Sequence, residues 1–358
     1  MRVLFVSKRH PQQRDLIDRP YGRFHHLPVA LAALGHDVRV ALCSHRRLAS
    51  VDIEHCGVRW SSHDLLALGP RRLVRTLAAE AEAFRPDWII GCSDAWFGWL
   101  AQHLAHRSGA RLAIDAYDNY EAYMRWNLPL HWSWRRAVRA ADLVTVAGPQ
   151  LAARLQSHRD GGSPVEILPM AADPEFRARD KHGCRHLLGL PAEARLLGYV
   201  GGWTRSRGTH LVIDAFERVR EQRPDARLVL SGRPPDAVLR VPGVIGLGYL
   251  PDASLPLLVS ALDVACIVTA DTAFGRYSYP AKLCEAMACS IPVVASDTDA
   301  VRWMLEGRER HLARVGDAGD FARRILELLD HPVADYGIRA EWKDVAVQLE
   351  QDLRTGLH

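Results

Sequence analysis

A lysine and a glutamate stand three residues apart in a segment that could bind a nucleotide. The apolar runs at 264–268 and 292–296 predict two buried strands, and the helix between them is expected to begin near Pro280. On that helix Lys282 and Glu285 share one face, close to the crevice where free amide groups and the helix dipole favour an anion. The ammonium group could meet a diphosphate and the carboxylate could meet ribose hydroxyls, although a surface ion pair has the same spacing.

A second candidate phosphate site follows the strand expected at 196–201. The turn reads G-G-W-T-R-S-R-G, with Gly201, Gly202, Arg205 and Arg207 placed between a strand and a helix. Glycines let the backbone approach a ligand, and guanidinium groups bind phosphate oxygens in pairs. No G-x-G-x-x-G follows the first strand of the chain, which argues against a dinucleotide-dependent dehydrogenase.

The elements that must position these residues repeat as strand, then helix, which predicts an α/β protein with parallel sheets. A length of 358 residues, with 48% hydrophobic and 25% charged residues, suits two globular domains. We expect a boundary near residue 175. Besides those already given, the expected strands are 2–7, 37–43, 87–92, 111–117, 143–148, 165–170, 228–232 and 244–250, with a short one in 311–315 and a last helix over 335–355.

Composition narrows the setting of the protein. No run of eighteen apolar residues occurs and a strand is expected directly after Met1, so we expect neither a signal peptide nor a spanning helix. Seven cysteines without a C-x-x-C pair predict reduced thiols and a cytoplasmic protein. No His/Cys cluster has metal-ligand spacing, so we expect no metal site and no cofactor.

The charge is uneven along the chain. The net charge is +4, and residues 1–170 hold 22 Lys/Arg against 16 Asp/Glu, whereas the remainder is slightly acidic. This excess indicates an anionic partner for the first half. Recognition motifs for nucleic acid are missing, so we expect no nucleic-acid partner.

The segment P-A-K-L-C-E-A-M-A-C-S-I-P-V-V-A-S, residues 280–296, resembles the donor-site signature of retaining glycosyltransferases of family 4. The G-H-D-V entry to the second strand, residues 35–38, is similar to the opening of the same family. The resemblance implies the GT-B fold: two Rossmann-like domains facing a central cleft, with a C-terminal helix, about 342–358, that returns to the first. Residues 1–175 would form the acceptor-side domain and 176–341 the donor domain.

The resemblance also implies roles for particular residues. Glu285 would bind the donor ribose, while Arg205, Arg207 and Lys282 would neutralise the departing diphosphate. Tyr277 and Ser290 stand where the family has a second glutamate and a glycine, and Gly202 stands where it has an arginine. The implied donor contacts are Gly201, Gly202, Gly232, Arg233, Tyr249, Leu250, Arg276, Tyr277 and Ser278.

In the first half we expect acceptor or sugar contacts near the ends of strands. The loop before the first helix holds Gly22 and Arg23, which the resemblance assigns to acceptor or donor phosphate. Asp118, Asn119 and Glu121 follow the strand at 111–117, and would contact the sugar or the acceptor. The alternative is a helix N-cap at Asp118 or Asn119, with Glu121 completing a capping box.

Residues 123–139 interleave aromatic rings with arginines. Such a mixture suits the interface of an anionic bilayer, an aromatic platform for an acceptor, or a helix whose tryptophans lie in the core. Residues 70–75, with three arginines, form a second candidate for membrane contact. The arginines concerned are Arg71, Arg72, Arg75, Arg125, Arg135, Arg136 and Arg139, and the rings are Tyr123, Trp126, Trp132 and Trp134.

Together these features predict a retaining glycosyltransferase that moves a sugar from a nucleotide-diphosphate donor to a glycan, a lipid-linked or a small-molecule acceptor. Two alternatives stay open. A nucleotide-sugar epimerase has the same architecture, and a non-catalytic nucleotide-sugar-binding protein would explain the departures from the family pattern. Membrane association at the cytoplasmic face is expected if the aromatic segment binds lipid.

Overall fold

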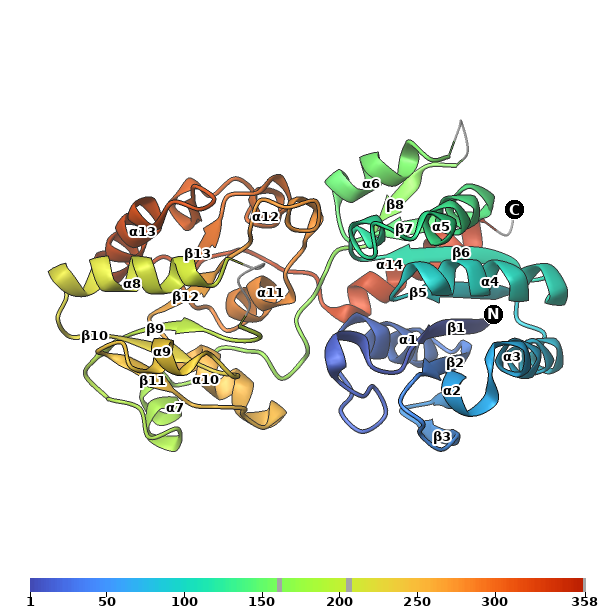
Figure 1. The fold of residues 1–358 in the computed structure, drawn as a ribbon, viewed down its shortest axis with the longest axis horizontal. Coiled ribbons are helices and arrows are strands. Elements are labelled where there is room, and N and C mark those ends of the chain that lie inside the picture. Colours follow the sequence, from blue (N-terminus) through green and yellow to red (C-terminus); the bar gives the residue numbers. More distant parts are fainter. Residues whose placement is uncertain (160–162, 204–207, 357–358) are drawn as a thin grey trace. The chain divides into compact units, whose positions relative to one another are not determined.

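The computed structural model describes residues 1–159, 163–203 and 208–356, which form two compact units (Figure 1). Unit 1 comprises Met1–Met170 and Ala340–His358, and unit 2 comprises Ala171–Arg339. The chain therefore leaves unit 1, builds all of unit 2, and returns to unit 1. The boundary after Met170 lies a few residues before the predicted one near 175.

Unit 1 is built on an eight-stranded sheet in the order β3-β4-β2-β1-β5-β6-β7-β8. All its neighbouring strands run parallel except β3, which pairs antiparallel with β4. The inner strands are buried along almost their whole length, as expected where helices cover both faces of a parallel sheet. The strands are β1 (Arg2–Lys8), β2 (Asp37–Ser44), β3 (Val51–His55), β4 (Val58–Asp64), β5 (Trp88–Cys92), β6 (Arg111–Ala116), β7 (Leu143–Val146) and β8 (Val165–Ile167).

The helices of unit 1 follow the strands in the usual crossover pattern. Neighbouring helices α3, α4 and α5 pack in sequence, and α1 packs against the returning helix α14. In α14 the side chains of Leu349 and Leu353 are buried, and the Trp342 ring stacks on His26. The helices are η1 (Pro11–Gln13), α1 (Arg23–Ala33), α2 (Leu65–Leu68), α3 (Pro70–Phe84), α4 (Ala95–Ser108), η2 (Tyr120–Ala122), α5 (Leu128–Ala140), α6 (Pro149–Gln156) and α14 (Trp342–Thr355).

Unit 2 holds a six-stranded parallel sheet in the order β11-β10-β9-β12-β13-β14. Its core joins the sheet to α8 and α13, with Phe216, Phe321 and Ile325 almost fully buried. The strands are β9 (Arg195–Tyr199), β10 (Ala226–Leu230), β11 (Val244–Gly246), β12 (Val264–Ile267), β13 (Val293–Ser296) and β14 (Leu312–Ala313). The helices are α7 (Lys181–Leu187), α8 (His210–Gln222), α9 (Asp236–Leu239), η4 (Asp252–Ser254), α10 (Leu255–Ala261), η5 (Gly275–Tyr277), α11 (Ala281–Ala288), α12 (Asp299–Met304), η6 (Glu309–His311) and α13 (Ala318–Asp330).

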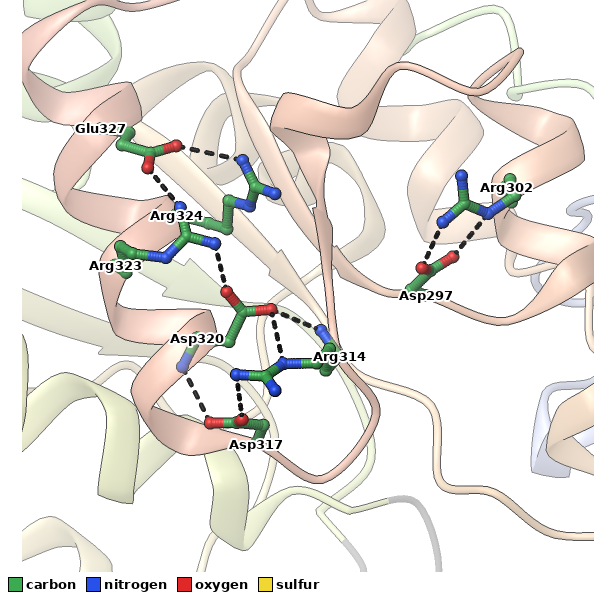
Figure 2. A network of polar contacts seen from close by, with 8 residues as sticks. All are labelled: Asp297, Arg302, Arg314, Asp317, Asp320, Arg323, Arg324 and Glu327. Atoms are coloured by element: carbon green, nitrogen blue, oxygen red, sulfur yellow. Dashed lines mark hydrogen bonds and ion pairs between the residues drawn. The ribbon is translucent and has the colours of Figure 1, made fainter.

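A carboxylate network fixes the start of α13 to the end of β14 (Figure 2). Asp317 caps the helix by accepting from the amide of Asp320 at 2.9 Å, and Asp320 accepts from the amide of Arg314 at 2.9 Å. Arg323 then pairs with Asp320 one turn into the helix. Carboxylates in the first turn suit the positive end of the helix dipole, so this network holds α13 against the sheet.

The expected parallel α/β architecture is confirmed, with two departures. The β3–β4 hairpin was not predicted, because β3 is mostly exposed and its polar residues give no strand signal. The last helix begins at Trp342 rather than 335, since Gly337 adopts a left-handed φ of 68° inside a turn that Asp335 closes.

Candidate functional site

In the sheet of unit 2 the order in which the chain adds strands reverses between β9 and β12. β10 and β11 lie on one side of β9, whereas β12, β13 and β14 lie on the other. At such a switch point the loops from the two central strands diverge and leave a crevice at their carboxyl ends, where α/β proteins bind ligands. The loop after β9 and the start of α11 both lie at this edge (Figure 1).

Lys282, in the first turn of α11, lies directly over Gly201 of the loop after β9. A Cβ added to Gly201 would lie 2.5 Å from Lys282 Cε and nearer still to Nζ. Gly201 has a φ of +131°, a conformation that side chains rarely adopt. The structure therefore brings a cation and a bare peptide together across the switch point, although the two residues are 81 positions apart in the chain.

A second glycine completes this close approach. A Cβ at Gly232, after β10, would lie 2.8 Å from the carbonyl oxygen of Gly201, and Gly232 has a φ of +92°. Its amide donates to the carbonyl of Gly248 at 2.7 Å, which ties the loops after β10 and β11 together. Three successive strand ends thus present backbone rather than side chains next to the ammonium of Lys282.

The ring of Tyr199 lies next to the ammonium group of Lys282. Lys282 Nζ lies 4.9 Å from the centroid of the Tyr199 ring, and Tyr199 Oη donates to the carbonyl of Gly202 at 3.0 Å. The ring face attracts the ammonium group, so this contact helps to hold Lys282 over the glycine. Gly202 itself is exposed.

Glu285 lies one turn further along α11 and is half-buried. The opposite face of the helix is apolar, with Leu283, Cys284 and Met287 buried. Burial raises the pKa of Cys284 to about 12 and that of Cys266 in β12 to about 12, so both thiols remain protonated. The polar side chains that α11 offers to a ligand are therefore Lys282 and Glu285.

The loop between β12 and α11 is tightly folded. A Cβ at Gly275 would collide with the carbonyl of Ala270, and the amide of Gly275 donates to Thr272 Oγ1 at 2.9 Å. Arg276 is exposed and pairs with Asp271 of the same loop. The other two residues predicted here to contact the donor, Tyr277 and Ser278, are half-buried at the end of this loop.

The remaining predicted donor contacts lie at the same edge of the sheet or outside the described residues. Arg233 and Tyr249 are exposed, and Leu250 is half-buried; they directly follow Gly232 and Gly248, the pair joined by the hydrogen bond described above. Arg205 and Arg207 lie in 204–207, outside the described residues. The structure therefore brings together Gly201, Gly232 and Lys282, with Glu285 on the adjacent turn.

In unit 1 the structure gives Arg23 a different role from the predicted one. Its guanidinium is buried, donates to both carboxylate oxygens of Asp115 at 2.7 and 2.6 Å, and donates to the carbonyl of Leu168 at 3.0 Å. Burial alone would lower the pKa of Arg23, but the charge of Asp115 and the hydrogen bonds to it outweigh burial, so the pKa is raised. Arg23 is thus committed to an internal ion pair, and we no longer assign it to phosphate. Gly22 directly precedes α1, with a φ of +61° and open space where a Cβ would lie.

Glu121 is likewise an internal residue. It is buried and accepts from Arg135 at 2.5 Å, Arg154 at 2.7 Å and His158 at 3.1 Å. Burial favours the neutral carboxyl, but these hydrogen bonds and charges outweigh burial and lower the pKa of Glu121. The predicted sugar contact of Glu121 is therefore replaced by a structural role.

The two residues before η2 are buried as well. Asp118 and Asn119 are both less than a tenth exposed, and Asn119 Oδ1 accepts from Arg154 Nε at 3.2 Å. Asn119 precedes η2 without a side-chain cap hydrogen bond, so the N-cap expected as an alternative at Asn119 is not formed.

Sequence reasoning missed a group at the switch point of unit 1. Between β1 and β5 the amide of Lys8 donates to Ser93 Oγ at 2.9 Å, and Lys8 Nζ pairs with Asp94 at 3.3 Å. Ser93 has a left-handed φ of 76°, an uncommon conformation for serine that often marks functional loops. The available signal was the S-D that directly follows a buried strand.

The described residues offer neither a cluster of metal ligands nor a membrane-spanning helix. No group of three or more His, Cys, Asp or Glu side chains in this part of the chain is placed to hold a metal ion. Within the same residues, no helix has both the length and the apolar character needed to span a bilayer.

The fold and this site define a class of protein. Two units built on parallel sheets, the second with a lysine over a glycine turn at its switch point, have the architecture of a GT-B protein. Residues 22–171 match the glycosyl transferase 4-like domain, and residues 194–331 match the family described as glycosyl transferases group 1. The chain belongs to these glycosyltransferase families.

Known relatives agree with this assignment. The chain is 30% identical over 221 residues to a phosphatidyl-myo-inositol mannosyltransferase of Mycobacterium leprae, a match that covers 57% of each protein. The match thus spans little more than half of that relative's length.

Solved structures show the same fold at low sequence identity. Sucrose-phosphate synthase from Thermosynechococcus elongatus superposes with a TM-score of 0.77 at 20% identity, over 99% of this chain and 98% of that one. HepE of Anabaena, in complex with UDP-glucose, superposes with a TM-score of 0.71 at 16% identity, over 100% and 99%.

Proposed function

We propose that this protein is a retaining glycosyltransferase that transfers a sugar from a nucleoside-diphosphate donor to a hydroxyl acceptor. The observation that carries the proposal is Lys282 held over Gly201 at the switch point of unit 2. The family matches over both halves of the chain support it. The complex of HepE with UDP-glucose makes UDP the first nucleotide to test.

In the proposed reaction the bond between the sugar C1 and the diphosphate oxygen breaks while the acceptor oxygen bonds C1 on the same face. The acceptor proton passes to the leaving phosphate oxygen, so no separate protein base is required. Lys282, together with the dipole at the amino end of α11, stabilises the negative charge that grows on the diphosphate. Such preorganised groups lower the barrier because their charge is already in place.

Glu285 takes the role of ribose ligand. It lies one turn beyond Lys282 on α11, so a nucleotide with its diphosphate at Lys282 can place its ribose at Glu285. Arg205 and Arg207 remain candidates from the sequence for further diphosphate contacts.

The acceptor class follows from a relative. The mannosyltransferase of Mycobacterium leprae is named for phosphatidyl-myo-inositol, a lipid. A lipid-linked acceptor therefore comes first among those to be tested, ahead of glycans and small molecules.

The test is calorimetric titration of UDP, GDP, ADP and their sugar conjugates, followed by assays with candidate acceptors. Glu285→Gln should weaken nucleotide binding by about 1 to 3 kcal/mol, because a charge-assisted hydrogen bond to the ribose is lost. Glu221→Gln, at an exposed position of α8, is the matched control and should bind normally.

Each other outcome excludes a part of the proposal. Unchanged affinity in Glu285→Gln would remove the ribose assignment. Release of free sugar without an acceptor would indicate an epimerase or hydrolase, and tight donor binding without turnover on any acceptor would indicate a non-catalytic binding protein. A product with inverted anomeric configuration would exclude the retaining mechanism.

A further inference from the structure

Four exposed tryptophans lie on or beside two neighbouring helices of unit 1. Trp96 and Trp99 are 49% and 40% exposed on α4, and Trp126 and Trp132 are 79% and 63% exposed before and on α5. Leu128, at the first position of α5, is 70% exposed. We call these five residues the indole face. Exposed apolar clusters of this kind mark interaction surfaces.

The two helices are locked together, which gives the indole face a fixed shape. α4 packs directly against α5, as Figure 1 shows, and a Cβ at Gly98 would lie 2.7 Å from the ring of the buried Trp134. Trp99 and Trp132 line the same groove of about 500 Å³ between the helices. The two helices that carry the rings therefore form a fixed base.

The charges around the indole face are mostly positive. Arg125, Arg136 and Arg139 are exposed, and Arg136 Cζ lies 5.6 Å from the centroid of the Trp132 ring. Of the nearby carboxylates, Glu121 is buried among Arg135, Arg154 and His158, and Asp142 at the rim of the groove accepts from the amide of Leu112.

The adjoining helix α3 adds to this positive charge. It packs against α4, and Arg71, Arg72 and Arg75 are exposed in its first two turns. None of the three has an ion pair to another described residue. The surface therefore combines indole rings with an excess of guanidinium groups.

This combination selects one occupant. Indole rings settle at the headgroup level of a bilayer, and guanidinium groups meet lipid phosphate at the same depth. A second copy of the chain would oppose arginines to arginines in a two-fold interface. A neutral glycan would use the rings but gain nothing from the cations.

We propose that the indole face, with the arginines around it, docks this protein on an anionic membrane surface. The proposal does not rest on the transferase activity, because it concerns a surface formed by helices of unit 1 alone. If the proposed activity also holds, the same surface would bring a lipid-linked acceptor to the enzyme.

The test is sedimentation of the purified protein with vesicles of phosphatidylcholine alone or mixed with phosphatidylglycerol. The wild type should sediment with the mixed vesicles, much less with the neutral ones, and less at high salt. Leu128→Ser should lower the partition coefficient about tenfold, because a large apolar side chain no longer enters the interface. Leu187→Ser on α7 is the matched control, since Leu187 is also 70% exposed, and it should bind as the wild type does.

A second pair of variants tests the charges. Arg136→Gln should lower binding to the mixed vesicles about fivefold. Arg240→Gln, at an exposed position in unit 2, should leave it unchanged. Lys282→Ala should also sediment normally, so that a failure of the proposed transferase site does not affect this result.

Three results would overturn the proposal. One is a wild type that does not sediment with either kind of vesicle. Another is Leu128→Ser binding as well as the wild type does. The third is that binding of a soluble oligosaccharide, or self-association of the protein, depends on Leu128 and Trp132 while vesicle binding does not.

Discussion

Replacing Gly201 by alanine would test the centre of the proposed site. The new Cβ would collide with the Lys282 side chain, whose Cε would lie only 2.5 Å away, so the ammonium group must leave its position. The φ of +131° adds strain of about 1 kcal/mol, and losing the contact of Lys282 with the Tyr199 ring costs up to about 1 kcal/mol more. We expect a loss of about 2 kcal/mol in the free energy of unfolding.

Thermal unfolding and calorimetry measure the two consequences. For a unit of this size the loss in stability corresponds to a fall of roughly 4 to 8 °C in Tm. Displacement of Lys282 should weaken nucleoside-diphosphate binding about 10- to 100-fold, because a hydrogen bond from a charged group is lost. Gly307→Ala is the control, since Gly307 also has a positive φ but a Cβ there meets no atom within 4 Å. It should show the strain without the loss of affinity.

A double-mutant cycle separates the collision from the strain. In a Lys282→Ala background the obstructing side chain is absent, so adding alanine at 201 should cost only about 1 kcal/mol. The reasoning fails if Gly201→Ala costs the same with and without Lys282. It also fails if Gly201→Ala binds nucleotide as tightly as the wild type does.

Two further variants test charges inside unit 1. Arg23→Met should lower the free energy of unfolding by about 3 to 5 kcal/mol, because it leaves the buried Asp115 without its partner. Adding Asp115→Leu should restore much of this loss in chemical unfolding experiments. Unchanged stability together with weaker anion binding would show that Arg23 binds a ligand instead. Asp352 Oδ2 has no hydrogen-bond partner among the described residues, and burial, with the charge of Glu166, raises the pKa of Asp352 from 3.8 to about 6. Ionising this carboxyl therefore destabilises the folded protein above pH 6. Asp352→Asn should raise the free energy of unfolding by about 1 to 2 kcal/mol at neutral pH, after allowance for the partial exposure of the side chain. This gain should vanish as the pH falls from 6 toward 3.8. An equal gain in thermal stability at every pH would contradict this assignment.

Much of the fold could be predicted because buried parallel strands leave a simple signal. Short runs of Val, Ile and Leu placed the central strands within a few residues of their observed bounds. The β3–β4 hairpin gives no such signal, since β3 is mostly exposed and its turn uses Cys56 and Gly57 with φ of 52° and 72°. Cysteine is not a residue from which a left-handed turn is expected.

Candidate site residues could be predicted where they lie in one sequence motif. They could not be predicted where the residues that contact each other are far apart in the sequence. Lys282 and Glu285 follow from a single helix, so their spacing was enough to place them together. For Arg23 the deciding contact is Asp115, 92 positions away, and no local pattern reveals that the two are paired. The Lys8–Ser93–Asp94 group was missed for the same reason.

The return of the chain into unit 1 has a consequence for biosynthesis. The ribosome completes the whole of unit 2 before α14 emerges, so until then the side of α1 that Trp342 and its neighbours cover stays bare. During that interval the nascent first unit exposes apolar surface that chaperones or proteases can recognise. A chain interrupted anywhere in unit 2 would keep this apolar surface exposed, whereas α14 covers it in a finished chain.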